Sequence, residues 1–250
     1  MDIDDPDALE LRHRIIQEKP FLRRIYQEWY EHLAAGVPAG AGAVLEIGAG
    51  AGFLREYLPE VIRSDVFPHP FADIVLDGSA LPLPDGALRG IVMVNVFHHL
   101  AEPRRFFAEA ARCVRPGGAM VMVEPWVTAW SRLVYTKLHH EPFQPAATEW
   151  EFQSTGPMSG ANGALPWIVF ERDRFQFERE FPLWIIRNVE IRMPFRYLLS
   201  GGLSMKSLVP NWSFGLCRSL DRSLQPWSRS LGMFAFIRLE RRDLAHPLTA

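Results

Sequence analysis

The sequence predicts an α/β fold with a doubly wound, mostly parallel sheet. Residues 43–47 form a short apolar run that ends in a glycine-rich turn. Four further apolar runs have the length of buried strands, and they cover residues 61–66, 74–76, 90–96 and 119–123. An amphipathic helical pattern over residues 103–114 precedes the last of these runs. Strands that alternate with helices in this way imply parallel pairing through right-handed crossovers.

The first part of the chain is predicted to be helical. Apolar residues recur with helical spacing over residues 7–35, but Pro20 cannot continue a helix, so we expect two helices joined at that point. Residues 36–42 are rich in glycine, proline and alanine, which is typical of a short hinge. Residues 1–42 are therefore assigned to an N-terminal helical cap.

Residues 43–124 are assigned to the first half of the sheet. We expect a helix over residues 53–58 directly after the glycine-rich turn. The run over residues 90–96 is almost continuously apolar, as in a strand buried on both faces. The turn Arg115-Pro116-Gly117-Gly118 is predicted to end the amphipathic helix before the fifth strand begins.

The character of the chain changes after Glu124, since seven of the eight tryptophans follow it. We expect helices over residues 131–138 and 172–180, strands over 184–191 and 233–239, and an apolar, aromatic-rich insertion over 193–229. Residues 125–240 are therefore assigned to a lid or acceptor region with the closing strands of the same domain, and residues 241–250 to a tail.

Composition excludes some classes of protein. The chain has 250 residues, of which 48% are hydrophobic and 22% charged. Its net charge of −2 lacks the excess of positive charge that is typical of a nucleic-acid-binding protein. The acidic start lacks the layout of a signal peptide, and no apolar run approaches the ~20 residues of a membrane span. Cys113 and Cys217 form no disulfide framework. We expect a cytoplasmic protein; its oligomeric state is left open.

The glycine-rich turn is the central functional signal. Gly48, Gly50 and Gly52 follow the first strand, and glycines there bring bare backbone close to a ligand. The spacing is G-x-G-x-G, whereas the dinucleotide fingerprint would need glycine at Phe53. A phosphate-binding loop is also excluded, because no Gly-Lys-Ser/Thr follows. A tight turn without a ligand is the alternative.

Polar residues follow the next three strands, where open α/β sheets bind ligands. Asp65 ends the second strand, 19 positions after Glu46, and a carboxylate there can accept hydrogen bonds from ribose hydroxyls. Asp77-Gly78-Ser79 follows the third strand and can hydrogen-bond the edge of an adenine. Asn95 ends the fourth strand. A turn or helix cap is the alternative for Asp65, and an Asx-turn for Asp77.

These motifs together resemble the class I S-adenosylmethionine-dependent methyltransferases, in particular their small-molecule and quinone-methylase branch. The matching segments cover residues 43–124, and they are residues 45–52, Asp65, Asp77 with Leu81-Pro82, residues 97–100 and residues 115–118. The resemblance implies a Rossmann-like sheet of seven strands whose last strand, residues 233–239, is antiparallel. It also implies S-adenosyl-L-methionine as cofactor. Glu46, Gly48, Ala49, Gly50 and Gly52 would hold its methionine part, Asp65 its ribose, and Asp77, Gly78 and Ser79 its adenine.

The sequence departs from the family at two points. Only residues 66–73 separate the second and third strands, too few for the usual crossover helix of ~10–12 residues. We therefore expect a cofactor pocket that is more open on that side. Leu88-Arg89 stands where the family often has Phe-Asp, but this position is distant from the ligand end of the sheet.

Histidines supply the candidates for a general base. His139-His140-Glu141 has no third ligand at i+4 spacing, so we predict no metal site there. His139 or His140 is the candidate that assists deprotonation of the acceptor. His98-His99 is interpreted first as a cap or core feature, with contact to substrate or cofactor as the alternative. Glu124 is expected to face the same pocket.

The predicted function is methyl transfer from S-adenosylmethionine to a small or lipid-like acceptor. The aromatic region after Glu124 is interpreted as the acceptor pocket, with peripheral contact to a membrane surface and a plain lid core as alternatives. Two competing functions stay open. One is a nicotinamide-dependent oxidoreductase, which the glycine spacing disfavours, and the other is a catalytically silent binding module.

Overall fold

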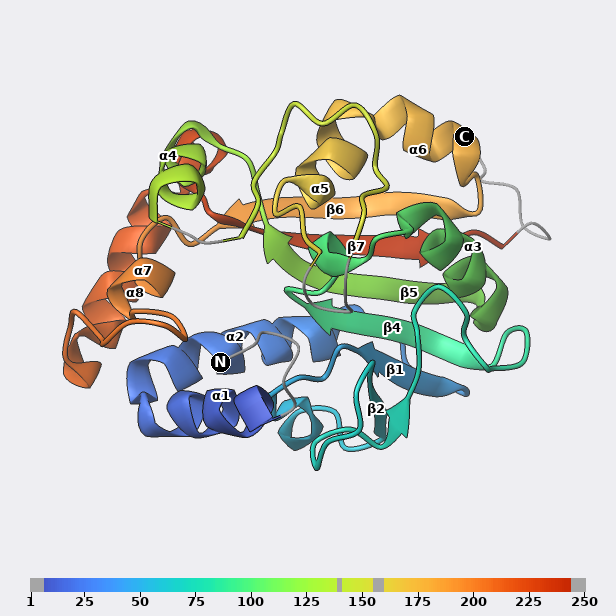
Figure 1. Ribbon diagram of the computed structural model, residues 1–250, viewed down its shortest axis with the longest axis horizontal. Helices are drawn as coiled ribbons and strands as arrows, with labels where there is room; N and C mark the ends of the chain where they lie inside the picture. The colour runs from blue at the N-terminus through green and yellow to red at the C-terminus, as the bar shows by residue number, and fades with distance from the viewer. Residues whose placement is uncertain (1–6, 139–140, 155–159, 244–250) are drawn as a thin grey trace.

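The computed structural model describes residues 7–138, 141–154 and 160–243, and its centre is a seven-stranded sheet (Figure 1). The strand order is β3-β2-β1-β4-β5-β7-β6. The strands are β1 (Ala43–Ile47), β2 (Val61–Asp65), β3 (Ile74–Val75), β4 (Leu88–Val94), β5 (Val114–Pro125), β6 (Trp184–Arg192) and β7 (Phe234–Arg241). β1 to β5 pair in parallel, and β7 runs antiparallel to both β5 and β6. The predicted fold class and the antiparallel last strand are confirmed.

Helices cover both faces of this sheet. The N-terminal pair is α1 (Asp7–Glu18) and α2 (Pro20–Gly36), so the predicted break at Pro20 is confirmed. Proline suits the first helical position because its missing N–H needs no partner there. The other helical elements are η1 (Leu54–Glu56), η2 (Phe97–His99), α3 (Pro103–Cys113), α4 (Ala129–Leu138), α5 (Leu165–Trp167), η3 (Ile168–Arg172), α6 (Arg174–Glu180), α7 (Arg196–Leu199), η4 (Asn211–Ser213), α8 (Phe214–Ser223), η5 (Gln225–Trp227) and α9 (Ser228–Leu231).

The central strands are buried on both faces, as their apolar runs predicted. Val44 and Val92 belong to the hydrophobic cluster that the N-terminal helices complete on one face. Leu45 and Ile91 are adjacent to these two residues in sequence and pair with each other across β1 and β4. They belong to the hydrophobic cluster that α3, α5 and α6 complete on the other face. Successive side chains of a strand point to opposite faces, so these strands leave polar groups room only at their ends.

Three predicted boundaries after the glycine-rich turn are wrong. The helix expected over residues 53–58 is only the 3₁₀ turn η1, since Pro59 restricts the residue before it and β2 begins soon after. β4 ends at Val94, because Asn95 has a φ of 55° and leaves the strand conformation. β5 runs to Pro125 through its pairing with β7, so Glu124 lies inside the strand and not after it.

The C-terminal half also differs in detail from its prediction. The helix expected from residue 172 begins at Arg174 and follows the π-helical turn η3. The insertion between β6 and β7 consists of the short helical elements α7 to α9, and Figure 1 shows α7 and α8 at one end of the molecule, beyond the N-terminal helices. The segment between β2 and β3 contains no helix, as the sequence predicted.

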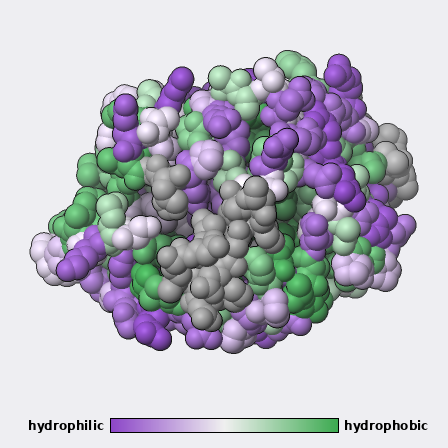
Figure 2. All heavy atoms as spheres, in the orientation of Figure 1, coloured by the Kyte–Doolittle hydropathy of each residue, from purple (hydrophilic) through white to green (hydrophobic). Residues whose placement is uncertain are grey.

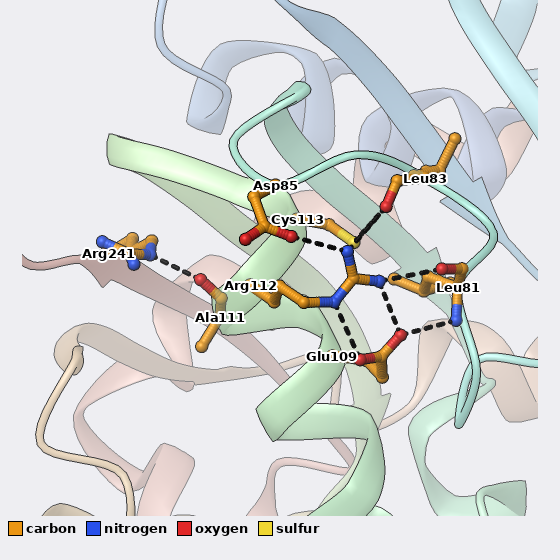
Figure 3. A network of polar contacts seen from close by, with 8 residues as sticks. All are labelled: Leu81, Leu83, Asp85, Glu109, Ala111, Arg112, Cys113 and Arg241. Carbon is orange, nitrogen blue, oxygen red and sulfur yellow. Dashed lines mark hydrogen bonds and ion pairs between the residues drawn. The ribbon is translucent and has the colours of Figure 1, made fainter.

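A guanidinium holds the segment after β3 against α3 (Figure 3). Arg112 donates hydrogen bonds to the carbonyls of Leu81 (2.9 Å) and Leu83 (2.7 Å), and it pairs with Asp85 and Glu109. Glu109 in turn accepts the backbone N–H of Leu81 at 2.9 Å. This network connects α3 to the loop that leads from β3 to β4.

We expect Phe107→Ala to destabilise the protein by about 3–5 kcal/mol, because the deletion leaves a cavity in a cluster of aromatic rings. Phe107 is fully buried, and its ring lies 5.0 Å from that of Phe177 and 5.1 Å from that of Phe181. Urea unfolding measures the change. Phe175→Ala is the matched control, since Phe175 is 89% exposed and its loss should change stability by at most about 0.5 kcal/mol. Equal effects of the two substitutions would contradict this packing.

Candidate functional site

A cavity of about 1010 Å³ lies at the carboxyl ends of β1, β2, β3 and β4. The glycine-rich turn and the residues after these strands line one part of it. The second part is lined by α4, α7 and the segments near them, through Tyr135, Leu138, Phe143, Tyr197, Leu198, Met205, Met233 and Phe234. A typical small-molecule pocket has ~300–1,000 Å³, so this cavity has room for a cofactor together with a second ligand.

The glycines of the turn act in two different ways. Gly48 and Gly50 have φ values of 65° and 50°, which favour glycine. A Cβ on Gly48 would lie 2.5 Å from Val96 Cγ2, whereas beside Gly50 the nearest atom would be 3.8 Å away. A Cβ on Gly52 would lie 2.3 Å from Tyr30 Oη, so this glycine admits the tyrosine of α2. The first two glycines shape the cavity wall, and the third also fits the N-terminal helix to it.

Glu46 places a buried carboxylate beside this turn. It is 4% exposed and lines the cavity. Burial raises the pKa of Glu46 to about 8; Arg63 opposes the rise and Asp65 adds to it. A carboxyl group in this environment binds a positively charged ligand group favourably, because the cation offsets the cost of ionising it.

Asp65 lines the cavity, but hydrogen bonds already hold its carboxylate. One oxygen accepts the backbone N–H of Gly50 at 2.8 Å, and the other accepts that of Val66 at 2.7 Å. His69 Nε2 lies 3.2 Å from the carboxylate, with its side chain almost fully buried. Asp65 therefore fixes the glycine turn, and its role toward a ribose stays a prediction.

Helix α1 contacts the segment beyond β2 at the edge of the pocket, where Val66 and Val75 line the cavity and stay 37% and 54% exposed. A pocket that is more open on this side stays a prediction. The ring of Phe71, in the short segment between β2 and β3, stacks on His13 of α1 at 4.3 Å. His13 also contacts the carbonyl of Ala51 in the glycine-rich turn at 2.9 Å. Helix α1 thus takes the place of the missing crossover helix, and its residues Leu9, Arg12 and Ile16 line the cavity.

The residues after β3 and β4 also reach the cavity, with one exception. Asp77 and Gly78 line it, whereas Ser79 lies outside the lining and donates its backbone N–H to Asp77 at 2.8 Å. This is the Asx-turn that the sequence offered as the alternative for Asp77. Asn95 lines the cavity as well, and its buried side-chain oxygen has no hydrogen-bond partner in the described structure.

Three acidic and basic side chains meet where β4 and β5 end. Glu124 is fully buried, and it accepts the backbone N–H groups of Val96 and Phe97, both at 2.8 Å. Its second oxygen accepts Nδ1–H of His98 at 2.7 Å. His98 Nε2 then lies 3.5 Å from Glu141. Burial by itself would lower the pKa of His98, but the hydrogen bonds to Glu124 and Glu141 outweigh it and raise the pKa to about 9.

His99 completes the cluster. Burial and the neighbouring charge of His98 lower its pKa to about 4, and its Nδ1 contacts the carbonyl of Gly160 at 3.1 Å. Atoms able to ligate a metal in His98, His99 and Glu141 lie within 4.8 Å of one another. However, a protonated His98 between two carboxylates already supplies the positive charge at this place. We therefore regard the cluster as one that binds protons and propose no metal there.

The structure thus brings together all of the predicted cofactor residues except Ser79 along one cavity wall. His139 and His140, the candidate bases, lie outside the described residues. Sequence reasoning missed Arg12, His69 and Tyr197 as neighbours of the site. Arg12 and Tyr197 approach the cavity from elements distant in sequence, so no local pattern could identify them. His69 follows Asp65 by four residues, and this spacing was the one local signal for its contact with the carboxylate.

Comparisons with known proteins agree with this arrangement. Residues 45–122 match a family described as a methyltransferase domain. An uncharacterized methyltransferase of Mycobacterium tuberculosis is 31% identical over 115 residues, which cover 40% of this chain and 46% of the relative. A probable S-adenosylmethionine-dependent methyltransferase of Mycolicibacterium smegmatis is 28% identical over 119 residues, which cover 42% and 44%. The chain therefore spans less than half the length of these relatives.

Solved structures share the fold. Geranyl diphosphate C-methyltransferase from Streptomyces coelicolor A3(2) aligns with a TM-score of 0.54 at 13% identity, over 93% of this chain and 83% of that one. A geranyl diphosphate methyltransferase in complex with its cofactor aligns with a TM-score of 0.52 at 15% identity, over 96% and 92%. At this level of identity the likeness concerns the fold alone.

The raised pKa of His98 predicts a pH-dependent stability. The folded pKa of about 9 exceeds the ordinary 6.5, so the stabilisation is complete below pH 6.5 and is lost as the pH rises to 9. A shift of this size corresponds to about 3 kcal/mol. Urea unfolding between about pH 6 and pH 9.5 should show this loss in the wild type and a smaller one in His98→Gln. The same slope in both proteins would mean that His98 is not held between Glu124 and Glu141 as described.

Proposed function

We propose that this chain, whose residues 45–122 match a methyltransferase-domain family, transfers the methyl group of S-adenosylmethionine to a small or lipid-like acceptor. One observation carries the proposal: the cavity is continuous from the glycine-rich turn to a wall built by α4 and α7. Both ligands can therefore lie in one enclosure, as a direct transfer between them requires.

The residues of the first part fit the cofactor. The open backbone beside Gly50 allows a ligand to approach closely, and the buried carboxylate of Glu46 suits the ammonium group of a methionine. Asn95 has a buried oxygen without a partner and a strained backbone, which are typical of a residue that awaits a ligand. Asp77 and Gly78 follow β3 on the same wall, where an adenine would lie.

The residues of the second part fit an apolar acceptor. Its lining is mainly aromatic and aliphatic, with Tyr135, Phe143, Tyr197 and Met233 among its members. The hydroxyl of Tyr135 donates to the carbonyl of Met233 at 3.1 Å, which leaves the ring to form the wall. A pocket of this kind buries an apolar ligand and fixes it through few polar contacts.

When bound, the cofactor would supply an activated methyl group for an in-line displacement by the acceptor. The chain itself must orient the acceptor, exclude water and take up a proton where the accepting atom carries one. Helix α1 contacts the segment between β2 and β3 at one edge of the cavity, and this contact limits the entry of water. Glu141, His98 and His99 line the cavity, and we propose that His139 or His140, which precede Glu141 in the sequence, accepts the proton.

The two competing functions make different predictions. A nicotinamide-dependent oxidoreductase would use the dinucleotide spacing, which this turn lacks, and the two mycobacterial relatives named above are described as methyltransferases. A silent binding module would bind the cofactor tightly and turn over no member of an acceptor panel. The two experiments below distinguish it from the enzyme.

Binding of S-adenosylmethionine should release protons from Glu46. The pKa of about 8 leaves Glu46 mostly protonated at pH 7, and a bound cation lowers this pKa. Calorimetry in two buffers of different ionisation enthalpy should thus detect about one proton released at pH 7 and far less at pH 9. Glu46→Gln should lose the release and bind about 10- to 100-fold more weakly. Glu178→Gln, on the exposed side of α6, is the control; a wild type that binds without proton release contradicts this role.

Replacement of both His139 and His140 by alanine should lower the turnover number by about 10²- to 10⁴-fold, as for loss of a general base. The substitution should leave cofactor binding intact, because neither histidine belongs to the predicted cofactor residues, which with the exception of Ser79 line the cavity at the carboxyl ends of β1 to β4. The measurement is methyl transfer to an acceptor identified from a panel, with cofactor affinity determined in parallel. Unchanged turnover would exclude both histidines as the proton acceptor.

A further inference from the structure

Large apolar side chains are exposed in one segment of the insertion between β6 and β7. Twelve large hydrophobic residues are exposed in the described part of the chain, and six of them fall within residues 205–227. We call these six the apolar ridge: Met205 (52% exposed), Leu208 (70%), Trp212 (77%), Leu216 (66%), Leu220 (50%) and Trp227 (58%). Scattered single residues of this kind are ordinary, but a concentration of them indicates a contact surface.

Helix α8 shows that the ridge faces outward. Phe214 and Asp221 are buried and fix the inner face of the helix. Leu216 and Leu220, one turn apart, lie on the opposite face, and Trp212 continues the same spacing in η4. A water-facing helix normally carries polar residues on that side, whereas this one carries leucine.

Basic groups flank the ridge. Residues 201–231 contain four cations and one acidic residue in a chain of net charge −2. The acidic residue, Asp221, is buried and pairs with Arg196 at 2.5 Å. Lys206, Arg218, Arg222 and Arg229 are all exposed, and Arg218 and Arg229 pair with Glu28 and Glu171 at 3.2 Å and 3.8 Å. Lys206 and Arg222 therefore give the surface around the ridge an excess of positive charge, and Figure 2 shows green and purple atoms interleaved at this end of the molecule.

This end is held firmly to the rest of the fold. Arg196 of α7 is buried and also pairs with Glu28 of α2 at 2.8 Å. Lys19, between α1 and α2, donates a hydrogen bond to the carbonyl of Gly202 at 2.7 Å and another to that of Met205. The segment that carries the ridge is therefore anchored to the N-terminal helices, and its tryptophans and leucines are exposed in this anchored state.

The ridge is continuous with the cavity. Met205 belongs to the ridge and also lines the cavity, next to Leu203 and Ser204. Leu138, at the end of α4, is 72% exposed and lines the same cavity. An apolar path therefore leads from the outer surface into the acceptor part of the cavity.

We propose that the apolar ridge docks on an anionic membrane surface and that the cavity receives an amphiphilic acceptor from that membrane. The inference rests on the proposed function for the identity of the acceptor part of the cavity. Tryptophan and leucine enter the boundary between headgroups and acyl chains, while the flanking Lys206 and Arg222 pair with anionic headgroups. Among the described residues, no helix is long and apolar enough to cross a bilayer, so this contact is peripheral.

Charge favours a membrane over a second copy of the chain. A two-fold symmetric contact through the ridge would bring the same basic side chains of each copy toward one another. Like charges across an interface are unfavourable, whereas a bilayer with anionic lipids complements them.

Vesicle sedimentation tests the proposal with the full chain. Vesicles of phosphatidylcholine with about 30 mol% phosphatidylglycerol should bind the wild type more tightly than phosphatidylcholine alone, and added salt should weaken the binding. The variant Trp212→Ser/Leu216→Ser/Leu220→Ser should reduce the partition coefficient by about tenfold or more. Lys206→Glu/Arg222→Glu should remove the preference for the anionic lipid; Arg218 and Arg229 are kept because they pair with Glu28 at 3.2 Å and with Glu171 at 3.8 Å.

Phe175→Ser is the matched control, since Phe175 is the most exposed of these hydrophobic residues but lies on α6; its binding should equal that of the wild type. The inference is overturned if the wild type binds neither kind of vesicle. It is also overturned if the wild type is a dimer in solution and the triple ridge substitution dissociates this dimer. Calorimetric binding of S-adenosylmethionine to the same preparations separates the two proposals. If the protein binds the cofactor but no vesicles, the result supports the proposed function and contradicts the membrane contact.

Discussion

The buried carboxylate of Glu124 organises the end of the sheet on which the site depends. A charge without solvent is costly unless hydrogen bonds satisfy it, and here the backbone N–H groups of Val96 and Phe97 and the ring of His98 do so. These contacts fix the segment that follows β4 onto β5. They also orient His98, which lines the cavity, so that Nε2 faces Glu141. A single interaction thus joins the stability of the sheet to the protonation of the site.

On the cofactor side of the cavity, helix α1 stands where a crossover helix between β2 and β3 would otherwise lie. The segment between β2 and β3 is too short for a crossover helix, and α1 covers the glycine-rich turn through His13 and Phe71 instead. Gly52 makes this cover possible, because any side chain there would collide with Tyr30 of α2. The N-terminal helices are therefore part of the pocket as well as part of the core.

The acceptor side combines rigid attachment with an apolar exterior. Arg196 connects α7 to α2 and α8 through buried ion pairs, and breaking such a pair would leave a charge without a partner. This anchoring keeps the leucines of α8 outward and places Met205 at the boundary between surface and cavity. The insertion between β6 and β7 thus supplies both α7, which lines the acceptor part of the cavity, and the ridge proposed to meet a membrane.

The sequence by itself determined the α/β class, the positions of the strands and the wall that holds Glu46, Gly48, Gly50 and Asp65, because apolar period and glycine spacing are local properties of the chain. Even the absent helix between β2 and β3 could be predicted from length alone. Only the tertiary structure decided that Glu141 approaches His98, that His69 and α1 cover Asp65, and that Leu216 faces outward. Except for the contact of His69 with Asp65, which lie four residues apart, these features depend on residues far apart in sequence, and their geometry follows from the packing of whole elements, which no local pattern encodes.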